Sequence, residues 1–298
     1  MKQRYLLALG MTAMVLIIGC KSSEEKQSET SKEEKKEAIV VKDTLNEVIY
    51  VLPSPNEMLD EIFIEKININ SSFINPYSNA EKYLDTRSQA INLGVYIADF
   101  AYLSNSTEST TELEYLKVIK KLSEEVNIHG LMGNKTIERI QNNLNERDTL
   151  KKISQELYYK ISNTLENSNR ENIFTLIATG AIIESLYLSV MIVDDFEDYI
   201  EIIGKMYEQK FVFDNFYEYA TVYKDDPYVR STLVQLDVLK ETFEEIEQNV
   251  EEATELESND DNTLRFTGGS KFIVDKENFK FFKSNIKSIR EEIIMPKN

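Results

Sequence analysis

The sequence predicts an all-α protein whose helices form a single multi-helix body. Only 9 glycines and 5 prolines occur among the 298 residues, and apolar residues recur every three or four positions along most of the chain, the spacing of amphipathic helices. Ser54-Pro55-Asn56-Glu57 adds a helix-start signal, because it combines a capping box with proline at the first helical position. About 250 residues of amphipathic helix can bury a substantial core.

The first twenty residues have the layout of a secretory signal. A basic start precedes the short apolar run from Leu6 to Ile18, and Gly19 comes directly before Cys20. This ending resembles the lipobox of bacterial lipoproteins, in which the cysteine becomes the acylated mature N-terminus. The resemblance implies a signal peptide at residues 1–19 and a palmitate-type anchor on Cys20, the only cysteine. The alternative is an ordinary signal peptide with an incidental cysteine.

Residues 20–41 are expected to form a disordered tether, since Lys21–Glu37 contains only Lys, Ser, Glu, Gln and Thr. In lipoproteins, an aspartate after the cysteine favours the inner membrane, so Lys21 favours the outer membrane. Ser22-Ser23-Glu24-Glu25 resembles the acidic patch that sends some Bacteroidota lipoproteins to the cell surface. The alternative is a solvated linker without an address.

Residues 42–298 are expected to be the helical domain. A small hairpin of 263–266 with 271–274 is considered, although an isolated ribbon of two strands is marginal. The apolar periodicity and the capping signals, including a second capping box at Ser78-Asn79-Ala80-Glu81, predict helices near 55–67, 79–104, 111–127, 134–146, 148–166, 170–193, 196–210, 213–223, 228–254 and 275–294.

An internal similarity predicts two related halves, at about 79–166 and 170–254. The segment 98–104 resembles 183–189 at a shift of 85 positions, and three apolar residues downstream match at a shift of 84. Each stretch reads as a long helix, a linker and a second amphipathic helix. The alternative is that any two amphipathic helices of this composition align equally well.

Three stretches carry a resemblance to a known group of proteins. Asn75-Pro76-Tyr77-Ser78 and the segment 85–99, together with Asn278-Phe279 and Ile289-Arg290, look like uncharacterised helical lipoproteins of Bacteroidota. The resemblance spans most of residues 45–295. It implies an all-helical fold and an envelope location, and it brings no catalytic residue.

A polar stripe marks the first long helix. Asp85, Asn92, Tyr96 and Asp99 follow one another at intervals that place them on one helix face. Three interpretations remain open: a solvated outer face, a buried hydrogen-bond network with Arg87 as a candidate member, and a ligand pocket.

The two halves suggest where a ligand site would lie. Asp99 and Glu184 occupy matching positions, each three residues before a tyrosine, Tyr102 and Tyr187. If equivalent helices meet, the two acids come together, and close carboxyl groups raise each other's pKa or hold a cation. The alternative is that each acid is solvated or paired with a nearby Lys or Arg.

Composition excludes several classes of function. The net charge of −18 argues against binding nucleic acid through its phosphates. With Cys20 lipidated and His129 the only histidine, neither a multi-histidine metal site nor thiolate catalysis is expected. No phosphate-binding loop or dinucleotide fingerprint occurs, so no cofactor and no metal is expected. The sequence therefore favours a membrane-anchored envelope lipoprotein with a non-enzymatic binding role; the alternative is a carboxylate-dependent hydrolase with its site between the halves.

Overall fold

The computed structural model describes part of the chain. The chain divides into two units, Met1–Glu37 and Ala38–Asn298, and every described residue belongs to the second unit. Cys20 and the predicted signal peptide therefore lie outside the described residues, as does the predicted tether up to residue 38. The described ranges are 39–43, 48–63, 69–105, 109–144, 146–246, 248–249, 255–258, 264–267, 271–272 and 274–295.

The second unit is mostly helical, which confirms the predicted all-α class. Two short 3₁₀ helices, η1 (Tyr77–Lys82) and η2 (Glu197–Tyr199), accompany the α-helices. The described residues form ten α-helices: α1 (Pro55–Ile62), α2 (Thr86–Leu103), α3 (Ser109–Glu125), α4 (Asn134–Gln141), α5 (Arg147–Glu166), α6 (Glu171–Met191), α7 (Ile200–Glu208), α8 (Lys210–Val222), α9 (Pro227–Glu244) and α10 (Lys276–Ile294).

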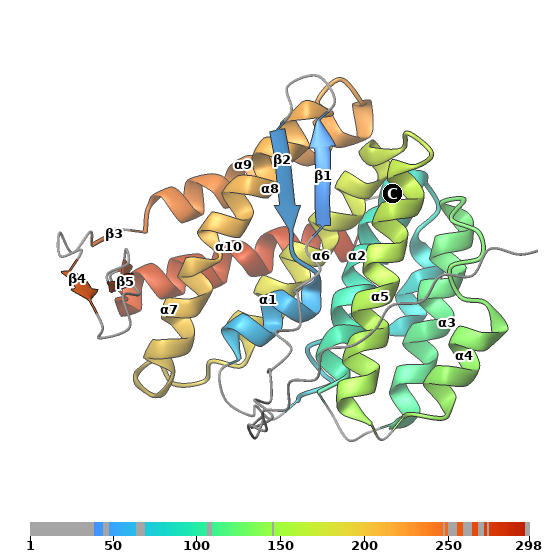
Figure 1. Cartoon of the computed structure of the whole chain (residues 1–298), viewed down its shortest axis with the longest axis horizontal. Helices are drawn as coiled ribbons and strands as arrows, with labels where there is room; N and C mark the ends of the chain where they lie inside the picture. Colours follow the sequence, from blue (N-terminus) through green and yellow to red (C-terminus); the bar gives the residue numbers. More distant parts are fainter. Residues whose placement is uncertain are drawn as a thin grey trace, which may run out of the picture. The chain divides into compact units, whose positions relative to one another are not determined.

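Helices α2 and α6 form the centre of this unit. In Figure 1, α3, α4 and α5 lie on one side of α6 and α7, α8 and α9 on the other, while α10 packs against both central helices. Every residue of α6 from Ile173 to Val190 is buried, and so is every residue of α2 from Ala90 to Leu103. A helix that is apolar on all sides has to be enclosed by others, and the surrounding helices meet that need.

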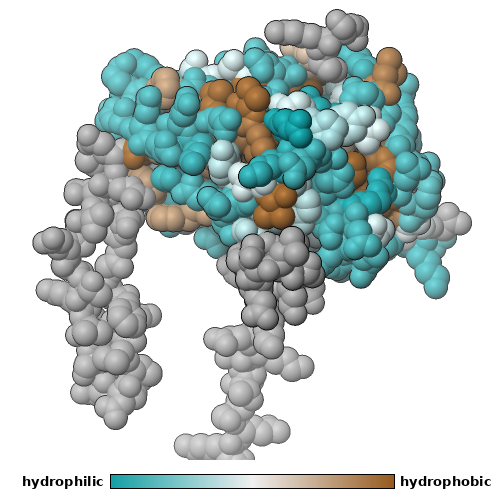
Figure 2. Space-filling model, turned by 90° about the horizontal axis from the view of Figure 1, so that it is seen from above, coloured by the Kyte–Doolittle hydropathy of each residue, from teal (hydrophilic) through white to brown (hydrophobic). Residues whose placement is uncertain are grey.

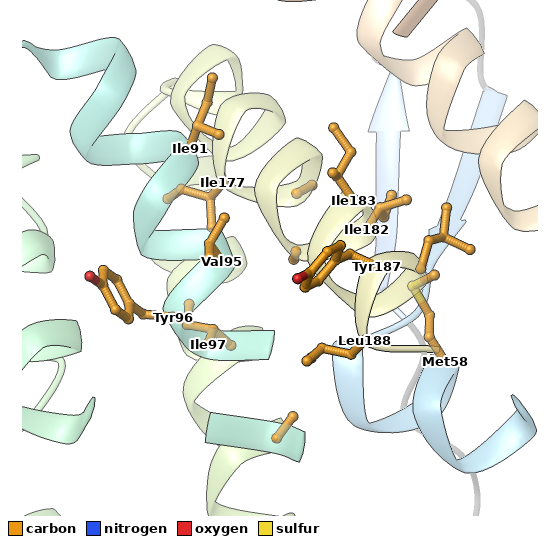
Figure 3. Close-up of a cluster of buried hydrophobic side chains, with 14 of the residues drawn as sticks. Met58, Ile91, Val95, Tyr96, Ile97, Ile177, Ile182, Ile183, Tyr187 and Leu188 are labelled. Atoms are coloured by element: carbon orange, nitrogen blue, oxygen red, sulfur yellow. The ribbon is translucent and has the colours of Figure 1, made fainter. Parts of the chain in front are cut away.

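Glycines allow the two central helices to touch backbone to backbone. A Cβ atom on Gly94 would overlap the carbonyl oxygen of Ile177, and a Cβ atom on Gly180 would overlap that of Ile91. The contact is reciprocal, and it relates residues 86 positions apart in α2 and α6. Figure 3 shows Ile91, Val95 and Ile177 along this contact.

Short strands occur at both ends of the described unit. β1 (Ile39–Asp43) pairs antiparallel with β2 (Val48–Leu52), and Tyr50 of β2 stacks edge-on against Tyr219 of α8. The predicted tether therefore ends too late, because residues 39–41 already belong to a strand. The pattern Ile39-Val40-Val41 is short and rich in β-branched residues, which favours a strand.

The predicted hairpin of 263–266 with 271–274 is wrong in its pairing. Instead, β5 (Leu264–Thr267) pairs with β4 (Glu255–Ser258), and β6 (Lys271–Phe272) pairs with β3 (Gln248–Asn249). The residues of β3 were predicted to continue a helix to residue 254, and those of β4 follow directly after that predicted end. That helix, α9, ends at Glu244. The sequence beyond it includes Glu251-Glu252, two charged side chains that a helix could not bury in the core.

Helix starts follow the sequence signals in part. Ser54 caps α1 in a complete capping box, and Asp226 caps α9 with Pro227 behind it. The box predicted at Ser78 does not start the long helix, because residues 77–82 form η1 and Asp85 caps α2. Asp85 also meets the requirements of a cap, since its carboxylate accepts the Ser88 N–H at 3.0 Å.

Candidate functional site

Three charged side chains meet inside the unit, one from each of α2, α6 and α10. Asp99 and Glu184 are 0% exposed, and the Arg290 side chain is 7% exposed. Arg290 donates two parallel hydrogen bonds to Glu184, from Nε to Oε2 at 2.9 Å and from Nη2 to Oε1 at 3.0 Å. The ring of Tyr187 lies under the guanidinium, 4.2 Å from its carbon to the ring centroid. We call Asp99, Glu184 and Arg290 the acid–arginine cluster.

Asp99 is the member of the cluster whose protonated form the fold favours. Burial, and next to it the charge of Glu184, raise the pKa of Asp99 well above its usual range, while Arg290 and the Asn75 N–H act in the opposite direction. Asp99 Oδ1 has no hydrogen-bond donor among the described residues. Two carboxylates cannot hydrogen-bond, but a proton on Asp99 lets it donate to Glu184, whose side chain lies within hydrogen-bonding reach. With that proton, the cluster is neutral: one cation faces one anion.

A loop closes over the cluster, and we call its residues Asn70–Pro76 the clasp. Its backbone is fixed by side chains of the helices beneath, as buried backbone groups require. Asn75 N–H donates to Asp99 Oδ2 at 3.1 Å, and Arg290 Nη2 donates to the Phe73 carbonyl at 3.3 Å. Three further tyrosine contacts complete the set: Tyr115 to Asn75 O, Tyr96 to Pro76 O, and Asn70 N–H to the Tyr102 hydroxyl.

The polar stripe of α2 is therefore largely buried. Asn92, Tyr96 and Asp99 are 0% exposed, so the interpretation as a solvated outer face is wrong for them. Asn92 Nδ2 donates to the carbonyls of Ser88 and Ile293, the second of which lies on α10. The structure supports the interpretation as a buried network, but its arginine is Arg290 and not Arg87.

The structure brings together part of the residue set predicted as a site. Asp99 and Glu184 meet, as the alignment of the two halves predicts, and Tyr187 joins them through Arg290. Tyr96 and Tyr102 contact the clasp, whereas Asp85 lies exposed at the start of α2, away from the cluster. The two acids meet as one predicted alternative has it, and Glu184 also pairs with an arginine, as the other alternative has it. A ligand for them remains a prediction.

The sequence reasoning missed Arg290 and Asn75 as members of the network. Arg290 could have been predicted from the sequence, because it lies among the apolar residues that α10 buries. These include Phe282, Ile286, Ile289 and Ile293. An arginine on an apolar helix face requires a carboxylate partner. Asn75 had no such signal, since its side chain and backbone bond to groups that are distant in sequence.

A surface pocket of about 280 Å³ lies where the start of α2 meets α9 and the end of α10. Arg87 contributes a half-buried guanidinium, which donates to Thr232 and Gln235 of α9. We call this the α2–α10 pocket; its other charged residues are Asp85 and Glu292, and its apolar residues include Ile91, Ile293 and Met295. Asp85 is the predicted site residue that lines it.

Helix α6 is long and apolar enough to cross a membrane, but 94% of its most apolar window is buried inside the unit. It also carries Glu184 at the cluster, which suits a core helix better than a lipid-facing one. Among the residues that the structure describes, α6 is the one helix of this length and apolar character. Within the same residues, no group of three His, Cys, Asp or Glu side chains is placed to hold a metal ion.

The fold and site thus define a helical protein with a sealed acid–arginine cluster and a mixed-charge surface pocket. Comparison with protein-family models, with curated proteins and with solved structures returns no match for this chain.

Proposed function

We propose that this chain is a lipid-anchored protein of the bacterial cell envelope that binds a partner or small molecule without catalysing a reaction. The basic start, the short apolar run and Cys20 support the anchor. The proposed location is the outer membrane, because Lys21 follows the cysteine, and the acidic pair Glu24-Glu25 favours display on the cell surface.

The burial of the two acids carries the non-enzymatic part of the proposal. A general acid or base has to reach the proton that it transfers. Asp99 and Glu184 are 0% exposed, the clasp covers them, and Glu184 is held on both oxygens by Arg290. A carboxylate-dependent hydrolase with its site at this pair would need the clasp to open and Arg290 to release its partner.

The proposal includes a duplicated helical core. The reciprocal contacts of Gly94 and Gly180 support it, since both relate residues at the same shift of 86. This register differs by one from the shift of 85 that pairs Asp99 with Glu184. Under the shift of 86, Asp99 corresponds to Ser185 and Ala98 to Glu184, so the two acids meet as neighbours across the proposed symmetry and not as strict equivalents.

The anchor is tested by metabolic labelling with a palmitate analogue. The wild type is expected to be labelled and recovered with outer membranes, and Cys20→Ser is expected to be unlabelled and unprocessed. Equal labelling of both chains would overturn the lipoprotein part of the proposal.

The binding role is tested against the hydrolase alternative with the purified full-length chain and panels of glycoside and ester substrates. No turnover is expected. Turnover that is lost in both Asp99→Asn and Glu184→Gln would overturn the non-enzymatic role, provided that both variants remain folded by circular dichroism.

A further inference from the structure

The α2–α10 pocket has the composition of a ligand site. It draws residues from three helices, and its volume of about 280 Å³ is slightly below that of typical small-molecule sites, about 300–1,000 Å³. A ligand that fills it would be smaller than a drug-sized molecule. None of the residues that line the pocket takes part in the hydrogen bonds that hold the clasp over the acid–arginine cluster.

Arg87 supplies a positive charge that forms no direct ion pair with a described carboxylate, although the charge of Asp85 acts on it from a greater distance. Its Nε donates to Thr232 Oγ1 at 3.0 Å and its Nη2 to Gln235 Oε1 at 2.9 Å, both neutral acceptors. Across the described residues, no carboxylate lies within 4.0 Å of its guanidinium. A guanidinium has five N–H groups, and two of them are used here. The others can take a carboxylate in the paired geometry that arginine favours.

The acceptors that hold Arg87 are themselves fixed. The Thr232 hydroxyl donates to the Tyr228 carbonyl at 2.9 Å, so its oxygen is turned to receive the Arg87 N–H. The Gln235 amide Nε2 lies 3.5 Å from Glu292 Oε2 on α10. The guanidinium plane is thus set before any ligand arrives, which lowers the entropy cost of binding.

Two carboxylates line the same pocket. Asp85 and Glu292 are both exposed. Partial burial acts to raise the pKa of Asp85, but the N–H and O–H of Ser88 outweigh it, and the pKa lies below its ordinary value. With two negative charges against one, on a chain of net charge −18, a purely anionic ligand is repelled. A ligand that satisfies Arg87 has to bring a positive charge for Asp85 and Glu292 as well.

The remaining wall is apolar. Ile91 and Ile293 are buried beneath it, and Met295 is 59% exposed beside it. Methionine adapts its shape to apolar ligands, because its side chain is unbranched and polarisable. We infer that the α2–α10 pocket binds a free α-amino acid with an apolar side chain: its carboxylate pairs with Arg87, its ammonium group with Asp85 and Glu292, and its side chain packs on Met295. This inference rests on the proposed binding role and names its ligand class.

The test is isothermal titration calorimetry of the full-length chain with L-leucine, N-acetyl-leucine and leucinamide. L-leucine is expected to bind saturably. Each derivative removes one of the two charges, so each is expected to bind about tenfold more weakly or worse. Equal binding of N-acetyl-leucine would show an anion site only, and equal binding of leucinamide a cation site only; either result, or no leucine binding at millimolar concentration, overturns the inference.

Variants locate the site. Arg87→Gln is expected to lose leucine binding, and Glu292→Gln to weaken it; Glu292 is exposed, so this variant should remain folded. Arg230→Gln is the matched control, because Arg230 is an exposed arginine of α9 whose guanidinium, among the described residues, bonds only to the carbonyls of Lys224 and Asp225. Unchanged binding in both Arg87→Gln and Glu292→Gln overturns the site. That failure would leave the anchored binding role standing, whereas turnover that is lost in both Asp99→Asn and Glu184→Gln would overturn the role itself.

Discussion

At the scale of single residues, the charges of the buried cluster balance when Asp99 is protonated, the form that its raised pKa favours. Arg290→Met is expected to lower the free energy of unfolding by about 3–5 kcal/mol at pH 7, since it leaves Glu184 buried without its cation. Urea denaturation of the wild type and the variant at pH 7 measures the loss.

Asp99→Asn is the matched control for that variant. Asparagine has nearly the shape of a protonated aspartic acid and can donate to Glu184 in its place, so a change below about 1 kcal/mol is expected. If Asp99→Asn were as damaging as Arg290→Met, the assignment of the proton to Asp99 would be wrong.

Glu112 is a second buried acid, and it gives the fold a pH dependence. It lies in the first turn of α3, is 0% exposed, and neither carboxyl oxygen bonds to a described residue. Burial raises its pKa from 4.5 to about 7. The unfolded chain therefore loses this proton at lower pH than the folded chain, and stability falls as the pH rises from about 4.5 to about 7.

Glu112→Gln removes that titration. Above pH 7 the variant is expected to be more stable than the wild type, by up to roughly 3 kcal/mol, and at pH 4 the two should be nearly equal. Thermal unfolding across this pH range checks the sign. A wild type that gains stability relative to the variant as the pH rises would contradict the account.

At the scale of the elements, the crossing of α2 and α6 depends on two glycines. Gly94→Ala and Gly180→Ala each place a methyl group against a backbone carbonyl of the partner helix, which rotamer changes cannot relieve. Each is expected to destabilise the fold by roughly 3 kcal/mol or more, and the proposed duplication implies similar losses at the two positions. Denaturant unfolding measures both.

Gly204→Ala is the control, because the nearest atom to its added Cβ is Val274 Cγ2 at 3.9 Å. Gly204 lies inside α7, so alanine should stabilise the helix by up to about 1 kcal/mol. If Gly94→Ala behaved like Gly204→Ala, the close approach of the two helices would be refuted.

The elements also show what sequence patterns can and cannot predict. The helices follow apolar periodicity, a local property, so all ten were expected near their observed positions. The pairings of β4 with β5 and of β3 with β6 join residues 6 to 24 positions apart, and periodicity carries no information about which segments pair. The α2 cap shows a second limit, because Ser78 and Asp85 both fit the cap pattern. The intervening Tyr83 bonds to Asn75 of the clasp and to the Ile294 carbonyl of α10, and the cap pattern carries no information about such contacts.

The candidate site, too, could be predicted from the sequence only in part. Asp99 and Glu184 could be named in advance because polar residues in apolar helices need partners. The sealing loop and the choice of Arg290 over Arg87 depend on how α10 packs across α2 and α6, a contact between residues about 100 to 200 positions apart.

At the scale of the whole molecule, the division at residue 37 separates two parts with different tasks in the proposed function. The first would attach the protein to the membrane, and the second would carry the binding surface. Binding by the second part would then be independent of the lipid, which makes the two parts separable in an experiment.

A chain that begins at Ala38 is accordingly expected to unfold at the same temperature as the full-length protein, because residues 1–37 form a separate unit. A chain that begins at Val48 loses β1, the pairing partner of β2, whose Tyr50 packs on Tyr219 of α8. Its melting temperature should fall, since β2 would present an unpaired edge to solvent. Differential scanning calorimetry of the three chains provides the comparison, and equal melting temperatures for the chains starting at Ala38 and Val48 would show that β1 contributes nothing to the body.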